Sequence, residues 1–95
     1  MLIIAGSLRV APEDRDGYVA SLDNLIRTTR AKPGCLDFVI AADPVDPGRV
    51  NLLERWESEE LLAAHQATAD VPEPVTEILT DTVRKYSIAS VGPVF

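Results

Sequence analysis

His65 is the only histidine of the chain, and it is the first candidate for proton transfer. Near pH 7 an imidazole can be neutral, and a neutral imidazole can take a proton from a weakly acidic group of a substrate. A second interpretation stays open, in which His65 is a partly buried helix residue hydrogen-bonded to a neighbour.

Five further residues are candidates for binding a small aromatic molecule. Trp56 and Phe38 offer flat apolar surfaces, although each could equally anchor the core. Ser7, Arg9 and Asn51 fall on predicted strands, where each could hydrogen-bond a ring oxygen or stabilise developing negative charge. Each of these three could instead face solvent or the edge of the sheet.

Two more side chains are interpreted as structural. Glu54 alternates onto the strand face that carries Trp56, so we expect partial burial and an ion pair with Arg9 or Arg55. Cys35 has no basic neighbour and no helix start beside it in the sequence to activate its thiol. We therefore expect Cys35 to act as a small buried hydrophobe.

No cluster of metal ligands accompanies these candidates. One histidine and one cysteine, well separated, form a zinc site only if several carboxylates converge on them. The chain also lacks a glycine-rich phosphate loop and a serine-centred nucleophile motif. We therefore expect the protein to use no metal and no cofactor.

Charge and composition limit the partners and the compartment. The chain has 15 acidic and 9 basic residues and a net charge of −6. Nucleic acids and anionic membranes require basic patches, so we expect neither as a partner. The apolar residues 1–6 are too few for a signal peptide, and a single cysteine excludes an internal disulfide. We expect a soluble protein of the reducing cytoplasm.

The candidate residues depend on a predicted strand and the helix that follows it. Residues 49–57 alternate as a strand does, which places Glu54 and Trp56 on one side. Ser58 can cap a helix whose first turn is acidic. Within this helix the spacings of three and four form an apolar stripe of Leu61, Leu62, His65 and Ala69.

The remaining pattern predicts one α+β domain over residues 1–95. We expect, in order, a strand over 2–10, a helix over 12–31, strands over 35–42 and 49–57 joined by a turn, a helix from 58 that becomes irregular near 70–74, a short helix over 75–82 and a last strand over 85–91. This order is the ferredoxin-like split β-α-β arrangement with a four-stranded antiparallel sheet.

Such a sheet carries helices on one face and exposes apolar side chains on the other. A chain of 95 residues buries only about 60–65% of the surface that its unfolded form exposes. Covering the open face with a second subunit adds buried apolar area, so we expect a homodimer.

Several blocks together resemble a known family. They are the short apolar first strand, Lys32-Pro33-Gly34-Cys35, the Asp-Pro turn, and Glu54-Arg55-Trp56-Glu57-Ser58 leading to Leu61 and His65. Over nearly the whole chain the sequence resembles the antibiotic biosynthesis monooxygenase family, which includes quinol monooxygenases. The resemblance implies a dimeric α+β barrel. Family members that oxidise aromatic substrates do so without metal or flavin, because the substrate itself reacts with oxygen.

The leading hypothesis is a homodimeric, cofactor-independent monooxygenase that oxidises a hydroquinone or polyketide phenol with O2. His65 would help to deprotonate the substrate, while Trp56 and Phe38 shape the cavity and one of the strand polar residues orients an oxygen. One alternative is a dimer that binds a small ligand without turnover. Another is an isomerase or cyclase on the same barrel, in which His65 moves protons without oxygen.

Overall fold

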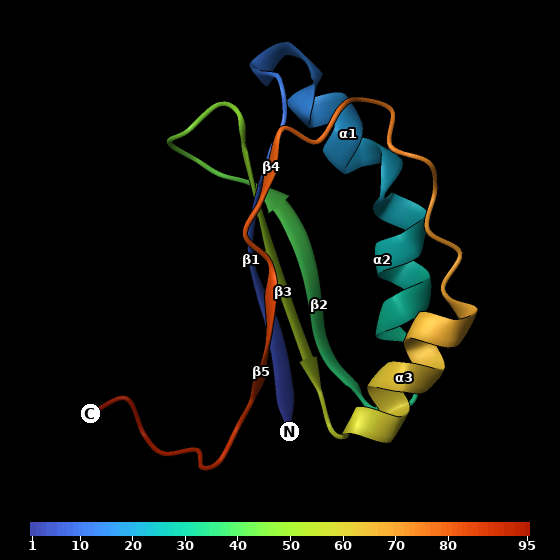
Figure 1. Ribbon diagram of the computed structural model, residues 1–95, viewed down its shortest axis with the longest axis vertical. Helices are drawn as coiled ribbons and strands as arrows, with labels where there is room; N and C mark the ends of the chain where they lie inside the picture. Colours follow the sequence, from blue (N-terminus) through green and yellow to red (C-terminus); the bar gives the residue numbers. More distant parts are fainter.

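The centre of the structure is an open antiparallel sheet with three α-helices on one face (Figure 1). The computed structural model covers residues 1–95. The strands are β1 (Leu2–Arg9), β2 (Cys35–Ala42), β3 (Arg49–Trp56), β4 (Thr80–Asp81) and β5 (Arg84–Ser87). The helices are the short 3-10 helix η1 (Pro12–Asp14) and the α-helices α1 (Arg15–Ser21), α2 (Asp23–Arg30) and α3 (Glu59–Thr68).

The strands follow the order β2-β3-β1-β4, and β5 also pairs with β1. Because β4 and β5 pair with successive stretches of β1, the sheet is four strands wide. This strand order is that of the ferredoxin-like split β-α-β fold. The predicted α+β class and ferredoxin-like architecture are therefore confirmed. None of the helices combines the length and the apolar character that crossing a bilayer requires.

The helix predicted over 12–31 is divided into η1, α1 and α2. The break between α1 and α2 lies at Leu22, whose backbone amide donates to Val19 O at 3.1 Å. The hydroxyl of Ser21 donates to Tyr18 O at 2.6 Å, which occupies a carbonyl at the end of α1. The bend lets both Tyr18 on α1 and Leu25 on α2 pack against the sheet.

The prediction of a short helix over 75–82 is wrong. The stretch contains no helix: Val75 and Thr76 form a bend. Further along, Leu79 N–H donates to Arg9 O at 2.7 Å and Thr82 N–H to Ser7 O at 2.9 Å. The free edge of β1 supplies hydrogen-bond acceptors for these amides. A single helical turn after Pro72 and Pro74 would be poorly stable, because short helices gain few hydrogen bonds and proline cannot donate one. Gly6 makes the close approach possible, since a Cβ there would lie 2.6 Å from Val83 Cα.

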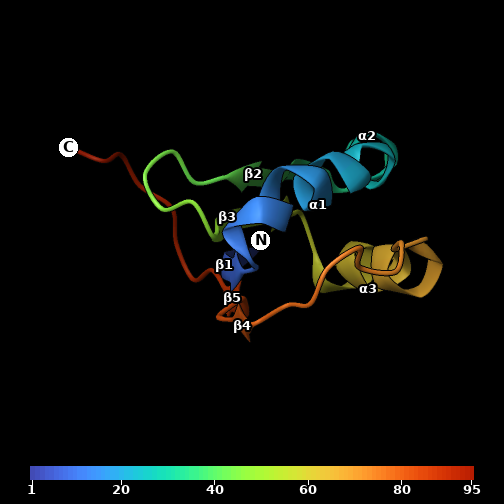
Figure 2. The same ribbon diagram turned by 90° about the horizontal axis from the view of Figure 1, so that it is seen from above.

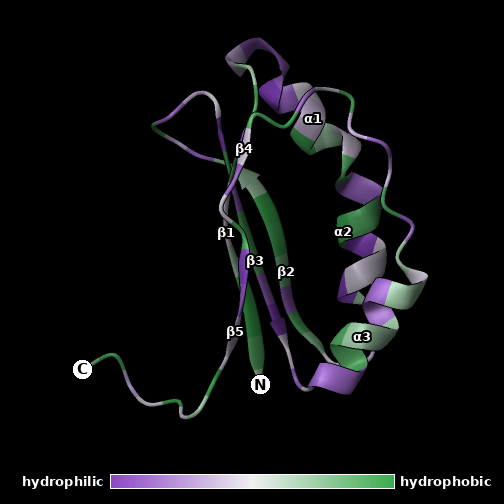
Figure 3. Ribbon diagram, viewed as in Figure 1, coloured by the Kyte–Doolittle hydropathy of each residue, from purple (hydrophilic) through white to green (hydrophobic).

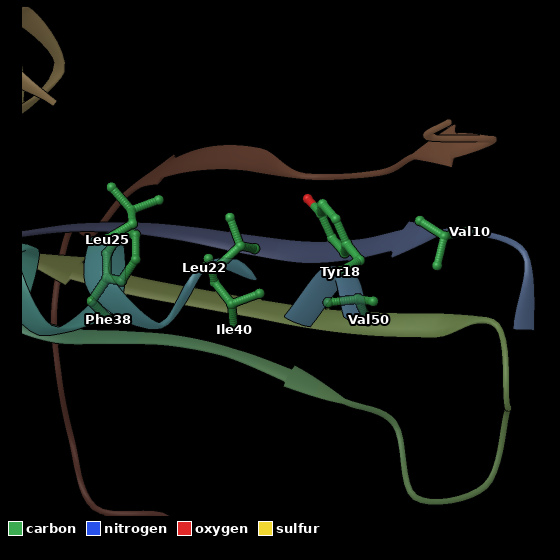
Figure 4. Close-up of a cluster of buried hydrophobic side chains, with 7 residues drawn as sticks. All are labelled: Val10, Tyr18, Leu22, Leu25, Phe38, Ile40 and Val50. Carbon is green, nitrogen blue, oxygen red and sulfur yellow. The ribbon is translucent and has the colours of Figure 1, made fainter. Parts of the chain in front are cut away.

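The two faces of the sheet are covered differently. The helix-facing side holds one buried cluster beneath α1 and α2 (Figure 4), formed by Val10, Tyr18, Leu22, Leu25, Phe38, Ile40 and Val50. A second cluster joins Trp56 to Leu2 and Leu62 of α3. The opposite face carries no helix (Figure 2), although hydrophobic residues continue along β1 (Figure 3). The uncovered face is mixed, because it carries the exposed Val39 and Leu53 beside polar residues such as Ser7 and Asn51.

Candidate functional site

A pocket of about 220 Å³ lies between the helix-facing side of the sheet and the helices. Eight of its ten lining residues are hydrophobic, namely Leu8, Tyr18, Leu22, Leu25, Phe38, Ile40, Leu52 and Val71. The other two are Glu54 and His65. An apolar pocket with a few converging polar groups is the usual form of a small-molecule site.

His65 reaches this pocket from α3. Ser58 caps the helix as predicted, since its hydroxyl accepts the Leu61 amide at 3.2 Å. The imidazole is 8% exposed and stacks on Trp56 with ring centres 4.8 Å apart and an interplanar angle of 22°. Phe38 meets it edge to face at 5.9 Å. Burial, together with the charge of Lys32, lowers the pKa of His65.

Lys32 is a polar neighbour of His65 that the sequence interpretation missed. Its ammonium Nζ lies 3.1 Å from His65 Nδ1 and 3.4 Å from Thr68 Oγ1. Gly34 allows the turn after Lys32 to pack closely on α3. Its φ is +83°, and a Cβ at this position would lie 2.4 Å from Leu61 Cδ1. The Pro-Gly turn was visible in the sequence, whereas the contact across 33 residues was not.

Glu54 differs most from its predicted role. Arg9 pairs with Asp46 and Arg55 with Asp37, so the expected ion pair of Glu54 with either arginine is wrong. Instead, Glu54 Oε1 accepts the Trp56 indole N–H at 3.0 Å. Burial raises the pKa of the Glu54 carboxyl, and the indole donor opposes that rise. A raised pKa brings a carboxylate closer to the range in which it exchanges protons near neutral pH.

The aromatic candidates take different places. Phe38 lines the pocket and is buried in the main core cluster. Trp56 is 0% exposed and does not line the pocket. Its ring instead stacks on the imidazole of His65, which does. Its alternation with Glu54 on β3 was the sequence signal that could have identified the carboxylate as part of the site. Tyr18, which the sequence interpretation did not select, also lines the pocket.

Ser7, Arg9 and Asn51 lie on the opposite face of the sheet. Ser7 and Asn51 are direct partners in the β1–β3 register, one step out of phase with the pair of partly buried Leu8 and buried Val50. Within one chain the structure therefore does not bring these three residues together with His65. Their side chains bond other groups of the open face.

Asn51 Nδ2 donates to Asp43 Oδ1 at 2.9 Å. Asp43 also accepts the amides of Asp46 and Val45, and these hydrogen bonds with that from Asn51 lower the pKa of Asp43 to about 2. Arg9 pairs with Asp46 in the same hairpin turn. Arg9 on β1 and Asn51 on β3 thus form side-chain contacts with the β2–β3 turn.

Cys35 is partly buried at the start of β2, opposite Trp56 in the β2–β3 register, and does not line the pocket. Burial raises the pKa of its thiol, and Glu54 and Asp37 add to that rise. A raised pKa leaves little thiolate, which is the reactive form. No group of three or more metal-binding side chains converges in the structure.

Comparison with known proteins identifies the family. The model of the antibiotic biosynthesis monooxygenase family matches residues 1–73. YcnE of Bacillus subtilis (strain 168), named as a proposed monooxygenase, is 23% identical over 69 residues, which cover 73% of each protein. An uncharacterized protein of Synechocystis sp. is 24% identical over 67 residues, which cover 70% of this chain but 46% of that relative. This chain therefore spans less than half of the Synechocystis protein.

Solved structures share the fold. A proposed antibiotic biosynthesis monooxygenase from Nitrosomonas europaea has a TM-score of 0.76 at 18% identity, covering 95% of this chain and 100% of that one. The haem degrader MhuD of Mycobacterium tuberculosis, solved with two haems in its active site, has a TM-score of 0.68 at 14% identity, covering 97% and 100%. The family match supports a monooxygenase or small-molecule-binding role. The chain belongs to the antibiotic biosynthesis monooxygenase family.

Proposed function

We propose that the protein is a cofactor-independent monooxygenase that oxidises a small phenolic substrate with O2. The observation that carries this proposal is the composition of the pocket, in which Glu54 and His65 lie among eight hydrophobic residues, one of which, Tyr18, also carries a hydroxyl. A carboxylate with a raised pKa is suited to remove a phenolic proton in water-poor surroundings, and a neutral imidazole beside it can exchange hydrogen bonds with the phenolic oxygen. Apolar walls suit an aromatic ring.

The chemistry balances without an added reductant. A phenolate gives one electron to O2, and the resulting radical and superoxide combine to form a carbon–oxygen bond. The hydroperoxide then loses water, so that a hydroquinone and O2 yield a hydroxyquinone and one water. Both electrons needed to reduce the second oxygen atom come from the substrate, and the protein supplies binding and proton transfer.

The size of the pocket limits the substrate. An apolar cavity of roughly 150 Å³ holds a benzene molecule in another protein. The pocket of about 220 Å³ therefore suits a ring with a few substituents, bounded by Phe38 at one end of the cluster and Tyr18 nearer the other (Figure 4). This favours hydroquinones and small polyketide phenols.

The test is oxygen consumption with a panel of hydroquinones and anthrones. We expect one O2 to be consumed per substrate, and one atom of ¹⁸O₂ to enter the product. The Glu57→Gln variant should match the wild type, because Glu57 is exposed outside the pocket. Saturable binding without oxygen uptake would instead support a binding protein. Exchange of substrate protons with deuterated water, again without oxygen uptake, would support an isomerase or cyclase.

We also propose a homodimer formed through the open face of the sheet. Val39 and Leu53 on this face are 37% and 38% exposed, although other residues of β2 and β3 are buried, and Tyr86 on the exposed strand β5 is 52% exposed. Burying such a face against a second copy removes apolar area from water. Stable interfaces of this kind bury roughly 1,200–2,000 Å² or more.

We expect light scattering at micromolar concentration to give about twice the chain mass of 10.3 kDa. Leu53→Lys should shift the protein toward a monomer, because a charge at this position would be buried without a partner. Val45→Lys is the control, since Val45 is 88% exposed in the β2–β3 turn. A wild-type mass of one chain would contradict the dimer.

A further inference from the structure

The contact between Lys32 and His65 determines where a neutral imidazole carries its proton. Lys32 Nζ lies 3.1 Å from His65 Nδ1. An ammonium group has three donors and no acceptor, so Nδ1 must be the acceptor. The remaining proton of the neutral ring is then on Nε2. In this form His65 has no free lone pair with which to take a proton.

We infer that Lys32 is a positioning residue: it holds neutral His65 with its proton on Nε2, so that His65 donates to the substrate oxygen while Glu54 accepts the proton. The assignment of the tautomer stands on the contact alone. The two roles toward substrate rest on the proposed function. This refines the interpretation of His65 as the base, because proton acceptance passes to the carboxylate that lines the same pocket.

The surroundings of Nε2 agree with a donor role. The contact with Lys32 is the only hydrogen bond of the imidazole within the protein. Nε2 is nevertheless not among the fully buried polar atoms that lack a partner. Nε2 therefore has no partner within the protein and is not fully buried, while Nδ1 is occupied. Stacking on Trp56 and the edge contact with Phe38 restrain the plane of the ring.

The charges around His65 favour the same division of roles. Lys32 approaches from the turn between α2 and β2, and Glu54 lies on β3 in the same pocket. The other close side chains, Trp56, Phe38 and Thr68, are uncharged. Protonation of Nδ1 would place two positive groups against each other, and burial adds to that cost. His65 therefore stays neutral, and Glu54 is left as the basic group.

Nuclear magnetic resonance of the imidazole tests the tautomer without any substrate. Because His65 is the only histidine, its ring signals need no assignment among others. We expect two-bond ¹H–¹⁵N correlations of the wild type at neutral pH to show the Nε2–H tautomer, with a pKa below the ordinary 6.5. In Lys32→Met the pKa should rise and the Nδ1–H tautomer should appear, because both the positive charge and the donor are lost.

Two variants serve as controls. Lys32→Arg keeps a charged donor and should retain the lowered pKa and the Nε2–H tautomer. Lys85→Met removes the only other lysine, which pairs with Glu59 at 3.2 Å, and should leave both signals unchanged. An Nδ1–H tautomer in the wild type, or the same pKa and tautomer in wild type and Lys32→Met, would overturn the inference.

Oxygen uptake separates this inference from the proposed function. If no variant and no wild-type sample consumes oxygen while the tautomer behaves as expected, the monooxygenase proposal fails and the positioning role of Lys32 stands. If the wild type consumes oxygen but carries the Nδ1–H tautomer, the enzyme assignment stands and the role of Lys32 is overturned.

Discussion

Glu54→Gln is expected to lower turnover of a phenolic substrate by about 10²–10⁴-fold, the usual contribution of a positioned proton acceptor. The amide keeps the shape of the carboxylate and keeps an oxygen that can accept the Trp56 indole N–H. What it loses is the ability to take a proton. The fall should therefore appear in kcat, with the circular dichroism spectrum unchanged.

The pH dependence gives a second measurement on the wild type. Glu54 must be ionised to accept a proton, so turnover should fall as pH drops through the pKa of this carboxyl. Burial raises that pKa above its ordinary value of 4.5, and the fall should begin at a correspondingly higher pH. In Glu54→Gln this limb of the profile should disappear.

Comparison with His65→Gln shows which residue is the base. If His65 only donates a hydrogen bond, glutamine can replace it, because glutamine retains an N–H donor although it cannot accept the substrate proton. We therefore expect turnover to fall less in His65→Gln than in Glu54→Gln. The reverse order would contradict the assignment of Glu54: a large loss in His65→Gln together with nearly normal turnover in Glu54→Gln would make His65 the base.

Trp56→Ala is expected to lower the free energy of unfolding by about 3–5 kcal/mol, as removal of a buried aromatic side chain usually does. Trp56 is 0% exposed and packs against Leu2 and Leu62. It also donates to Glu54 and stacks on His65, so the variant leaves a buried carboxylate without its donor. The total free energy of unfolding of a domain of this size is about 5–15 kcal/mol.

Urea unfolding followed by circular dichroism measures this effect at one fixed protein concentration, because association would shift the apparent stability. Trp56→Phe should recover part of the loss by filling the cavity, while leaving Glu54 without its donor. Val45→Ala is the matched control, since surface substitutions usually stay within about ±0.5 kcal/mol. A loss below about 1 kcal/mol in Trp56→Ala would contradict the anchoring role.

Local patterns in the sequence were sufficient for most of the elements. The β-forming residues of 35–42 and the alternation in 49–57 predicted β2 and β3, whose observed ranges are Cys35–Ala42 and Arg49–Trp56. The cap at Ser58 predicted the start of α3 within one residue. These signals are local, because alternation, turn residues and caps act through the backbone within a few positions.

The last quarter of the chain shows where local patterns fail. Residues 75–82 were predicted as a helix, yet Leu79 and Thr82 form hydrogen bonds to β1 residues that lie 70 and 75 positions earlier. The register of these pairs depends on the free edge of β1 and on the absence of a side chain at Gly6. Neither is visible within the segment itself.

The same distinction divides the candidate site. The sequence by itself placed His65 on an apolar stripe and Glu54 beside Trp56 on one strand face, because helix and strand periods assign residues to faces. Only the tertiary structure decided which sheet face meets the helices, and thereby removed Ser7 and Asn51 from the pocket. It alone brought Lys32 to His65. A contact between distant residues depends on how whole elements pack, and no local period records that packing.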